Sequence, residues 1–222
     1  MKTALVFGSS GLVGGHLVNQ LILNSNYSKI KIFVRSKIEL INPKIEIIET
    51  DFNDLEKYRN DITGEDCFFC IGTTRKNSPN KNEYERVELN IPRQIAQIAK
   101  LNSIKSFFFV SSGYADPKSS GDYLKFKGLV EQEIKNQNFD KIGIMRPSFL
   151  LGNRKEKRIG EKLGIRLFKL LTPILVGPLR KMRPVRAEIV AKAMVKLANE
   201  NINQSIFAVS YTHLTLPTND QV

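Results

Sequence analysis

Tryptophan is absent from this chain of 222 residues, and cysteine and histidine occur only twice each. Cys67 and Cys70 lie three positions apart in a strand-like run, where successive side chains point to opposite faces. We therefore expect reduced core thiols rather than a disulfide or a redox pair, and the second cysteine pair that a zinc site would need is missing. His16 and His213 are isolated and have no metal-ligand spacing, so no metal site is expected.

Long apolar runs are also missing. No run approaches the ~20 residues of a membrane-spanning helix. The first apolar run, residues 3–7, leads straight into a glycine turn, so we interpret it as a core strand and not as part of a signal peptide. The sequence therefore predicts a cytoplasmic protein.

Acidic residues are outnumbered, since 22 Asp and Glu stand against 34 Lys and Arg, which gives a formal net charge of +12. A nucleic-acid partner is one explanation. The basic residues are scattered, however, and a cofactor with several phosphates in a lysine-rich protein explains the charge as well. We expect no nucleic-acid partner, and we interpret the densest basic run, residues 154–158, as a solvated loop or a phosphate-facing edge.

Strand-like and helix-like runs alternate along the chain. Most strand-like runs are nearly continuous in apolar residues, which is typical of a sheet covered on both faces. The alternation predicts right-handed βαβ units and hence an α/β protein with a doubly wound parallel sheet, the Rossmann fold. Pro92 is expected to kink or restart its helix. The expected strands are Thr3–Phe7, Ile30–Val34, Ile45–Glu49, Cys67–Ile71, Ser106–Val110 and Ile142–Met145, and the expected helices are Leu12–Asn24, Glu83–Leu101, Tyr123–Asn136, Gly160–Leu171 and Ala187–Asn199.

A glycine-rich turn follows the first expected strand, with Gly8, Gly11 and Gly14 spaced G-x-x-G-x-x-G. The first glycine permits a tight turn, the second lets the backbone approach a phosphate, and the third lets the helix pack close to the strand. This pattern predicts a site for a dinucleotide pyrophosphate at the positive end of the helix, the alternative being a turn without a ligand. The residues expected at the cofactor here are Gly8, Ser10, Gly11, Leu12 and Val13.

The ends of the next strands indicate which dinucleotide binds. The second strand is followed by Arg35, where NAD-binding folds usually carry an acidic residue for the ribose hydroxyls. A guanidinium can bind a 2′-phosphate through two hydrogen bonds, so we expect NADP(H) rather than NAD(H). The alternative is a surface arginine, with Lys37 binding the phosphate. Phe52 serves either as a cofactor contact or as a core residue. Further cofactor contacts are expected from Asp51, Phe52, Gly72 and Thr73.

Tyr123 and Lys127 are four positions apart and share one face of an expected helix. An ammonium beside a phenol favours the phenolate, which suits a tyrosine that exchanges a proton with a carbonyl oxygen or a hydroxyl. Ser112, at the end of the preceding strand, can polarise the same oxygen. We expect these three residues to be catalytic. Tyr123 and Lys127 are also counted with the cofactor site, where Lys127 can bond the nicotinamide ribose. An exposed helical pair without a catalytic role is the alternative.

Together these motifs resemble the short-chain dehydrogenase/reductase superfamily in its atypical, NmrA-like branch. They are most similar to the Tat-interacting-protein-like oxidoreductases. The resemblance covers residues 2–208 and implies a Rossmann fold that binds NADP(H). The segments that carry it are GSSGLVG (8–14), IGTTRKN (71–77), YERVELNIP (84–92), and residues 110–131, 145–156 and 175–194.

The resemblance also implies roles for individual residues. Ser112 would polarise the carbonyl, Tyr123 would be the acid/base and Lys127 its activator. Asn90 stands where many members keep a helix asparagine that supports a proton relay, and it is counted with the cofactor site. Contacts near the nicotinamide carboxamide are implied for Pro147 and Ser148.

The chain departs from the superfamily pattern in two places. Ser112 and Tyr123 are closer in sequence than in typical members, so the loop of residues 113–122 must turn tightly. Residues 209–222 do not continue the family pattern, and their stretch VSYTHLTLPT resembles the translation of a transposase-type sequencing adapter. We interpret them as a non-native tail after a single domain of residues 1–208.

Residues 150–185 are expected to form a small C-terminal substrate lobe, or lid, within that domain. Its apolar helix lies beside basic residues and could dock on a membrane surface. We prefer a helix that covers the substrate pocket or contacts a second subunit.

The sequence thus predicts an NADP(H)-dependent oxidoreductase that transfers a hydride between the nicotinamide and a carbonyl or alcohol substrate, as a monomer or homodimer. The alternative is an NADP(H)-binding, redox-sensing regulatory protein with little or no turnover, because fold alone does not separate the two. The intact set of Ser112, Tyr123 and Lys127 favours catalysis, since a sensor would not need it.

Overall fold

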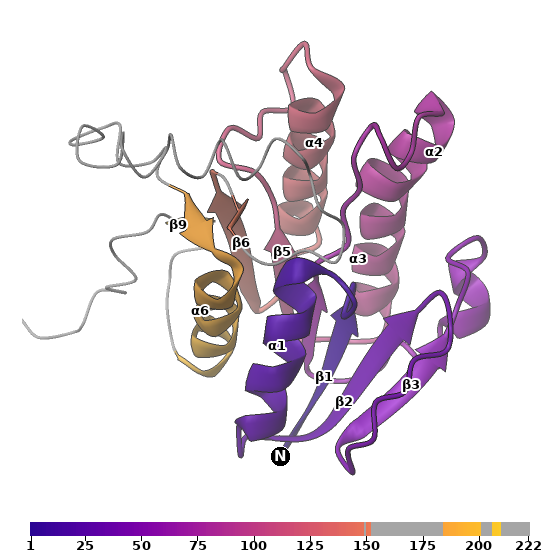
Figure 1. The fold of residues 1–222 in the computed structure, drawn as a ribbon, viewed down its shortest axis with the longest axis vertical. Helices are drawn as coiled ribbons and strands as arrows, with labels where there is room; N and C mark the ends of the chain where they lie inside the picture. The colour runs from indigo at the N-terminus through magenta and orange to yellow at the C-terminus, as the bar shows by residue number, and fades with distance from the viewer. Residues whose placement is uncertain (149, 152–183, 201–205, 210–222) are drawn as a thin grey trace, which may run out of the picture.

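The computed structural model describes residues 1–148, 150–151, 184–200 and 206–209. In this part of the chain a seven-stranded parallel sheet has the order β3-β2-β1-β4-β5-β6-β9 (Figure 1). The order runs outward in both directions from the neighbouring β1 and β4, so the sheet is doubly wound and the expected Rossmann fold is confirmed. The strands are β1 (Lys2–Phe7), β2 (Tyr27–Val34), β3 (Ile45–Glu49), β4 (Asp66–Phe69), β5 (Ser106–Val110), β6 (Lys141–Pro147) and β9 (Ile206–Val209).

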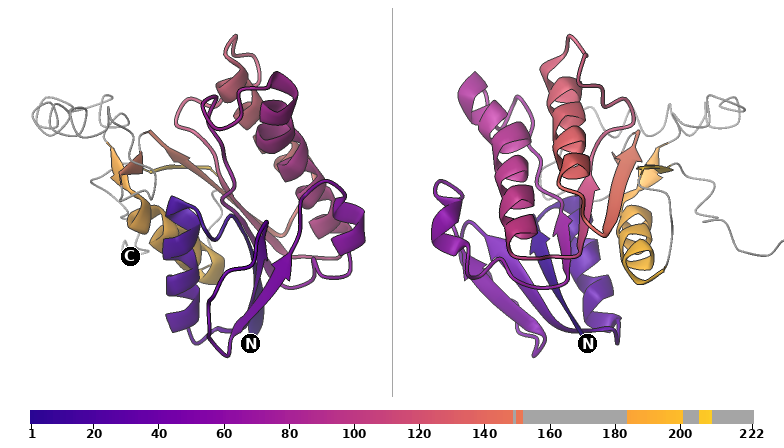
Figure 2. Two further views of the ribbon diagram at one scale, coloured as in Figure 1. Left: turned by 45° about the vertical axis from the view of Figure 1, so that its right-hand side comes forward. Right: turned by 180° about the vertical axis from the view of Figure 1, so that it is seen from behind.

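Side chains of each strand alternate between two core layers, one on each face of the sheet. On one face Ala4 and Val6 pack with apolar residues of α1 and α6, and on the other Leu5 and Phe7 pack with those of α3 and α4. Figures 1 and 2 show these two helical layers with the sheet between them. The helical segments are α1 (Leu12–Leu23), η1 (Leu55–Tyr58), α2 (Lys81–Glu85), η2 (Arg86–Asn90), α3 (Ile91–Leu101), α4 (Asp122–Asn136) and α6 (Ala187–Asn199).

Two expected strands, Ile45–Glu49 and Ser106–Val110, and the helix Ala187–Asn199 have the bounds that the sequence predicts. The expected interruption near Pro92 takes the form of η2, a π-helical turn, after which α3 begins. A proline lacks the N–H that an α-helix requires at that position, so the change in hydrogen bonding falls just before it. One of the buried residues in this turn is Glu88.

Both cysteines are free. Cys67 lies in the core layer of α3 and α4, whereas Cys70 packs against the layer of α1 and α6. Burial raises the pKa of the Cys70 thiol to about 12, so this thiol is a poor nucleophile at neutral pH. The two sulfurs are therefore reduced and on opposite faces of the sheet, as the spacing predicts.

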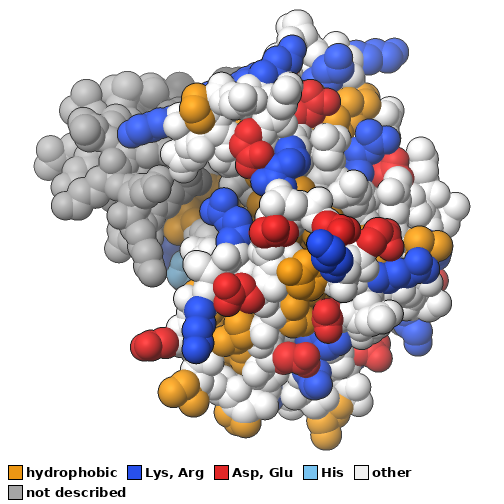
Figure 3. Space-filling view, turned by 90° about the vertical axis from the view of Figure 1, so that its right-hand side faces the viewer, with side chains coloured by type: hydrophobic (Ala, Val, Ile, Leu, Met, Phe, Trp, Pro, Cys, Tyr) orange, Lys and Arg blue, Asp and Glu red, His pale blue; other side chains and the backbone are white. Residues whose placement is uncertain are grey.

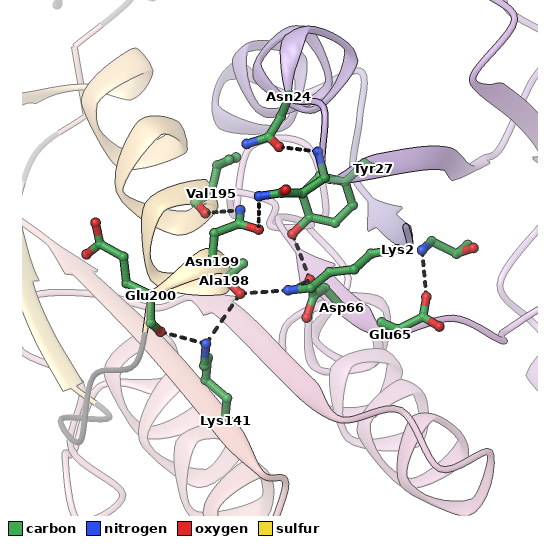
Figure 4. A network of polar contacts seen from close by, with 12 residues as sticks. Lys2, Asn24, Tyr27, Glu65, Asp66, Lys141, Val195, Ala198, Asn199 and Glu200 are labelled. Carbon is green, nitrogen blue, oxygen red and sulfur yellow. Dashed lines mark hydrogen bonds and ion pairs between the residues drawn. The ribbon is translucent and has the colours of Figure 1, made fainter.

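A polar network joins α6 to the amino ends of the strands (Figure 4). The buried Tyr27 hydroxyl donates to Asp66 at 2.7 Å, and Lys2 Nζ lies 3.0 Å from the same carboxylate. Lys2 also donates to the carbonyl of Ala198, and Lys141 donates to the carbonyls of Ala198 and Glu200. Burial, followed by the Asp66 charge, raises the pKa of Tyr27, which keeps this phenol neutral. The network attaches the last turn of α6 to the amino ends of the strands, at the edge of the sheet opposite to the strand carboxyl ends.

The expected lid is described only at its two ends. There β7 (Leu150–Leu151) pairs in parallel with β8 (Val185–Arg186) in a small second sheet. The rest of the lid, with the expected helix Gly160–Leu171 and the basic run, lies outside the described residues. So do His213 and residues 210–222, while the expected domain boundary after residue 208 falls inside β9.

Charged side chains of both signs are interspersed on the face drawn in Figure 3, rather than gathered in one basic patch. None of the helices that the structure describes is long and apolar enough to cross a bilayer.

Candidate functional site

The turn between β1 and α1 has the geometry that a pyrophosphate site needs. Gly8 has a φ of +90°, and a Cβ there would lie 2.8 Å from the backbone of Cys70 and Ile71. A Cβ on Gly14 would lie 2.0 Å from the carbonyl oxygen of Gly8, so α1 packs directly on the turn. Both close approaches require glycine.

The start of α1 can accept an anionic group. Its N-cap residue, Gly11, provides no side-chain cap, and its first turn carries no acidic residue. Among the described residues, the buried hydroxyl of Ser9 has no hydrogen-bond partner. Uncapped N–H groups and an unpaired buried hydroxyl fit the phosphates of a dinucleotide, with Ser10, Leu12 and Val13 lining the same turn.

The turn lies at the switch point of the sheet, where β1 and β4 are neighbours. The N–H of Cys70 donates to the carbonyl of Phe7 at 2.8 Å, which holds the loop after β4 beside the glycine turn. Gly72 and Thr73 follow in this loop. Ligands of doubly wound folds bind at this position, beyond the carboxyl ends of the strands.

At the other end of the proposed cofactor site, Arg35 is exposed directly after β2. Asp51 is also exposed, and hydrogen bonds from Asn53 lower the pKa of its carboxyl. Phe52 is buried in the core with a φ of 59°, and its carbonyl accepts a hydrogen bond from Arg86 at 3.0 Å. Of the two cofactor contacts expected after β3, Asp51 faces solvent, and the ring of Phe52 packs in the core.

The three expected catalytic residues lie on two neighbouring elements, the segment that follows β5 and the helix α4, which are joined by the 3.3 Å hydrogen bond from Lys127 to the carbonyl of Val110. Ser112 is buried just after this strand, and α4 carries Tyr123 and Lys127 on successive turns. The Tyr123 side chain is 41% exposed, whereas Lys127 is 3% exposed. Lys127 Nζ lies 6.0 Å from the centroid of the Tyr123 ring and 4.8 Å from that of Phe109 in β5. The phenol is therefore open to a substrate, with the ammonium beneath it.

The short loop between Ser112 and Tyr123 folds back on α4. The N–H of Ala115 donates to the carbonyl of Ser112, and the N–H of Asp116 donates to the carbonyl of Leu124, each at 3.1 Å. These bonds make the tight turn that the shortened spacing requires. They hold the loop that begins at Ser112 against the first turn of the helix.

Glu88 is a site residue that the sequence did not single out. Its Oε2 lies 3.1 Å from Lys127 Nζ, and its Oε1 accepts the N–H of Thr73 at 2.5 Å. Burial alone lowers the pKa of Lys127, but the nearby Glu88 carboxylate and Tyr123 outweigh it, and the pKa is raised overall. Asn90, expected to support a proton relay, is exposed two residues further along the same helical stretch. Its role stays a prediction, while the contact with Lys127 comes from Glu88.

A second buried carboxylate, Glu131, lies one turn beyond Lys127 in α4. Ser111 Oγ donates to its Oε1 at 2.5 Å, and Arg146 reaches the same carboxylate with Nε at 2.9 Å and Nη2 at 2.5 Å. These bonds raise the pKa of Arg146. The contacts join α4 to the ends of β5 and β6.

Pro147 and Ser148 follow Arg146 at the end of β6, beside this cluster. The carbonyl of Pro147 accepts the N–H of Gly113 at 2.8 Å, so this strand end lies against the loop after Ser112. The structure brings the ends of β5 and β6 together, as nicotinamide contacts from both would require. Among the described residues, no cluster of His, Cys, Asp and Glu has the arrangement of a metal site.

Comparisons with known proteins agree with this geometry. A family model described as NAD(P)H-binding matches residues 8–171. HTATIP2 of Rattus norvegicus is 32% identical over 173 residues, covering 75% of this chain and 70% of the relative. FMP52 of Lodderomyces elongisporus is 29% identical over 229 residues, covering 96% of this chain and 95% of the relative.

Two solved structures share the fold. The enzyme WbmH of Bordetella bronchiseptica in complex with NAD+ superposes with a TM-score of 0.72 at 14% identity, covering 95% of this chain and 76% of that one. The UDP-glucose 4-epimerase of Thermotoga maritima with UDP-glucose gives a TM-score of 0.69 at 16% identity, with 92% and 75% covered. At such low identity the likeness establishes the fold alone.

The cytoplasmic location expected from the sequence is contradicted by these comparisons. Relatives from Lodderomyces elongisporus, Coccidioides immitis, Debaryomyces hansenii and Aspergillus niger are all named as mitochondrial proteins. The expectation was wrong because it rested on the absence of an apolar leader, and that absence does not identify a compartment.

The glycine turn at the switch point, the fold and the matched relatives lead to one assignment. A nicotinamide dinucleotide is the cofactor class that the family model and the uncapped start of α1 both support. The chain belongs to the NAD(P)H-binding family and is an atypical, HTATIP2-like member of the short-chain dehydrogenases/reductases.

Proposed function

We propose that the protein is an NADP(H)-dependent oxidoreductase that transfers a hydride between the nicotinamide and a carbonyl or alcohol substrate. The observation that carries this proposal is the exposed Tyr123 near the buried ammonium of Lys127, which donates to the carbonyl of Val110, two residues before Ser112. A protein that only bound the dinucleotide would have no use for a solvent-facing phenol over a buried charge.

The bound nicotinamide supplies or accepts the hydride. In the reductive direction the Ser112 hydroxyl donates a hydrogen bond to the carbonyl oxygen and polarises it. Tyr123 gives its phenolic proton to that oxygen as negative charge develops there, and Lys127 stabilises the resulting phenolate. In the oxidative direction the same groups take the proton from the alcohol.

The cofactor would lie across the carboxyl ends of the strands. Backbone groups from Gly8 to Val13 would hold the pyrophosphate, and Arg35 would bind the 2′-phosphate of NADP(H). Asp51 would contact the adenosine end, and the nicotinamide end would reach Lys127. The remaining proposed contacts are Gly72, Thr73, Asn90, Pro147 and Ser148.

Replacement of Tyr123 by phenylalanine tests the chemical step. Loss of the phenolic proton should lower kcat by at least about 100-fold, the usual contribution of a general acid/base. The affinity for NADPH should change by less than about twofold, or roughly 0.4 kcal/mol, because most of the proposed cofactor contacts come from other residues. NADPH oxidation over a panel of aldehydes, ketones and quinones, together with calorimetric NADPH titration, measures both.

The matched control is Tyr114→Phe, which removes a phenol that is 53% exposed in the loop after Ser112. It should leave kcat unchanged. Equal turnover by the wild-type protein and Tyr123→Phe would remove the tyrosine from the mechanism. Tight NADPH binding by the wild-type protein without turnover of any substrate would instead favour the regulatory alternative.

Replacement of Arg35 by alanine tests the choice of cofactor. Loss of charge-assisted bonds to the 2′-phosphate should weaken NADPH binding by about 10- to 100-fold and leave NADH binding unchanged. Lys37→Ala is the direct competitor, since that side chain could bind the same phosphate. Lys29→Ala, which removes a lysine of β2 that pairs with Glu46, is the inert control. Equal affinities of the wild-type protein for NADPH and NADH would contradict the preference.

A further inference from the structure

The ion pair between Glu88 and Lys127 is buried on both sides. The Glu88 side chain is 0% exposed and that of Lys127 is 4% exposed. An ammonium at such a depth loses its hydration, and without a counter-charge it would release its proton. Lys127 also donates to the carbonyl of Val110 at 3.3 Å, but a neutral carbonyl does not replace a charge.

The other ionisable groups around Lys127 do not replace the Glu88 charge. The ring centroid of Tyr123 lies 6.0 Å from Lys127 Nζ, further away than the Glu88 carboxylate. Burial keeps the Cys70 thiol protonated, and burial also raises the pKa of Tyr84 to about 12. Arg75 stacks on the Tyr84 ring and pairs with Asp122, so these two charges neutralise one another at the rim of the site. In the part of the chain that the structure describes, Glu88 supplies the one carboxylate within ion-pair distance of Lys127.

The other oxygen of Glu88 binds the loop at which the cofactor is expected. It accepts the N–H of Thr73 at 2.5 Å, and a Cβ on Gly72 would lie 3.5 Å from it and 3.9 Å from Lys127 Nζ. One carboxylate therefore spans the loop after β4 and the lysine of α4. The π-helical turn η2 places it there, on the inward side of the helical stretch.

We propose that Glu88 is a positioning residue, which keeps Lys127 protonated and fixes it to the cofactor-contacting loop at Thr73. This inference rests on the proposed function for its meaning in catalysis, but the ion pair itself can be tested without turnover. It assigns the support of Lys127 to a carboxylate, whereas the resemblance implied only a proton relay at Asn90.

Two consequences follow for the cofactor. Because the same carboxylate holds Thr73 and Lys127, cofactor binding and the protonation of Lys127 should be linked, each favouring the other. Loss of the carboxylate charge should leave a lysine that is neutral at moderately alkaline pH. NADPH affinity should then fall as the pH rises through the new lysine pKa.

The direct test follows the ionisation of Lys127 by NMR in lysine-labelled protein, with Lys127→Met used to assign its signal. In Glu88→Gln the side chain still offers an oxygen to the Thr73 N–H, but the charge is gone. The Lys127 signal should titrate about one to three pH units lower than in the wild-type protein, the usual influence of one close opposite charge. Glu88→Asp, which keeps the charge, should restore most of that shift.

Glu83→Gln is the matched control, since it removes a carboxylate from the same helical stretch that pairs with Arg86 instead. It should leave the Lys127 titration unchanged. An unchanged titration in folded Glu88→Gln would overturn the proposal. NADPH titrations from pH 6 to pH 10 should show a steeper loss of affinity at high pH in Glu88→Gln than in the wild-type protein or Glu83→Gln. Parallel plots of affinity against pH for the three proteins would overturn the link between Lys127 and the cofactor.

If Glu88→Gln does not fold well enough for NMR, thermal unfolding measurements test the ion pair between Glu88 and Lys127 instead. The double variant Glu88→Gln/Lys127→Met should then be more stable than Glu88→Gln, because it no longer buries an unpaired ammonium. If the effects of the two substitutions on the free energy of unfolding were additive, the ion pair would be contradicted. Failure of the wild-type protein to turn over any substrate would sink the proposed reaction but leave the lysine titration as it is, so the two failures are distinguishable.

Discussion

Gly14→Ala should weaken cofactor binding by about 100-fold, although it adds a single methyl group. That methyl would lie 2.0 Å from the carbonyl oxygen of Gly8 and 2.7 Å from its carbonyl carbon. Neither atom belongs to a flexible side chain, so α1 must move away from β1 by about 1 Å or more to relieve the overlap. The N–H groups that would hold the pyrophosphate move with the helix, and a displacement of this size can cost about 100-fold in a positioned site.

Gly15→Ala supplies the comparison. A Cβ there would meet the Ser9 carbonyl oxygen at 3.5 Å, an ordinary contact, and alanine favours a helix over glycine by about 0.5–1 kcal/mol. This variant should bind NADPH like the wild-type protein and melt at the same or a slightly higher temperature. Calorimetric NADPH titration and thermal unfolding of both variants measure the difference. NADPH affinity in folded Gly14→Ala equal to that of the wild-type protein would show that the start of α1 does not hold the phosphates.

The fold could be predicted because its signals are local. Nearly every strand is a short apolar run, and the core layers follow the alternation of side chains along β1, with Ala4 and Val6 on one face and Leu5 and Phe7 on the other. Glycines at fixed spacing identified the turn at the switch point. Because the strands are parallel, the residues that follow them lie at one edge of the sheet, and Ser112 after β5 lies at the same edge as the glycine turn after β1.

Pairings between distant elements could not be predicted. Glu88 looks in sequence like any charged residue on a helix surface, and only the π-helical turn before Pro92 and the packing of α4 bury it against Lys127. Glu131 gave no signal either, because its partners Ser111 and Arg146 lie 20 and 15 residues away. Composition could not identify the compartment either. The sequence predicts a cytoplasmic location, and the relatives named as mitochondrial contradict it.

Glu131→Ala should strongly destabilise the carboxyl end of the sheet. The Glu131 carboxylate is 3% exposed, and it accepts bonds from the Ser111 hydroxyl and from two nitrogens of Arg146. Its removal leaves a guanidinium that is 27% exposed without its counter-charge and a buried hydroxyl without its acceptor. Breaking such a pair costs about 3 kcal/mol, toward the low end for buried pairs because the arginine keeps some solvent. For a chain of this size the Tm should fall by roughly 6–12 °C.

Glu133→Ala removes a carboxylate two residues further along α4. Its Arg93 partner, at 3.5 Å, is 43% exposed, and Glu133 Oε1 also accepts hydrogen bonds from the side-chain amides of Gln97 and Gln137. An exposed ion pair contributes about 1 kcal/mol or less and leaves no buried charge behind, so Glu133→Ala should cost less stability than Glu131→Ala in thermal unfolding. Equal Tm values for the two alanine variants would contradict the assignment. Because Glu131 also joins the strand ends of Ser111 and Arg146 to the helix of Tyr123, the folded fraction of Glu131→Ala should lose kcat more than NADPH affinity. The glycine turn that would hold the pyrophosphate lies on other elements, so it should bind the dinucleotide even when the ends of β5 and β6 separate from α4.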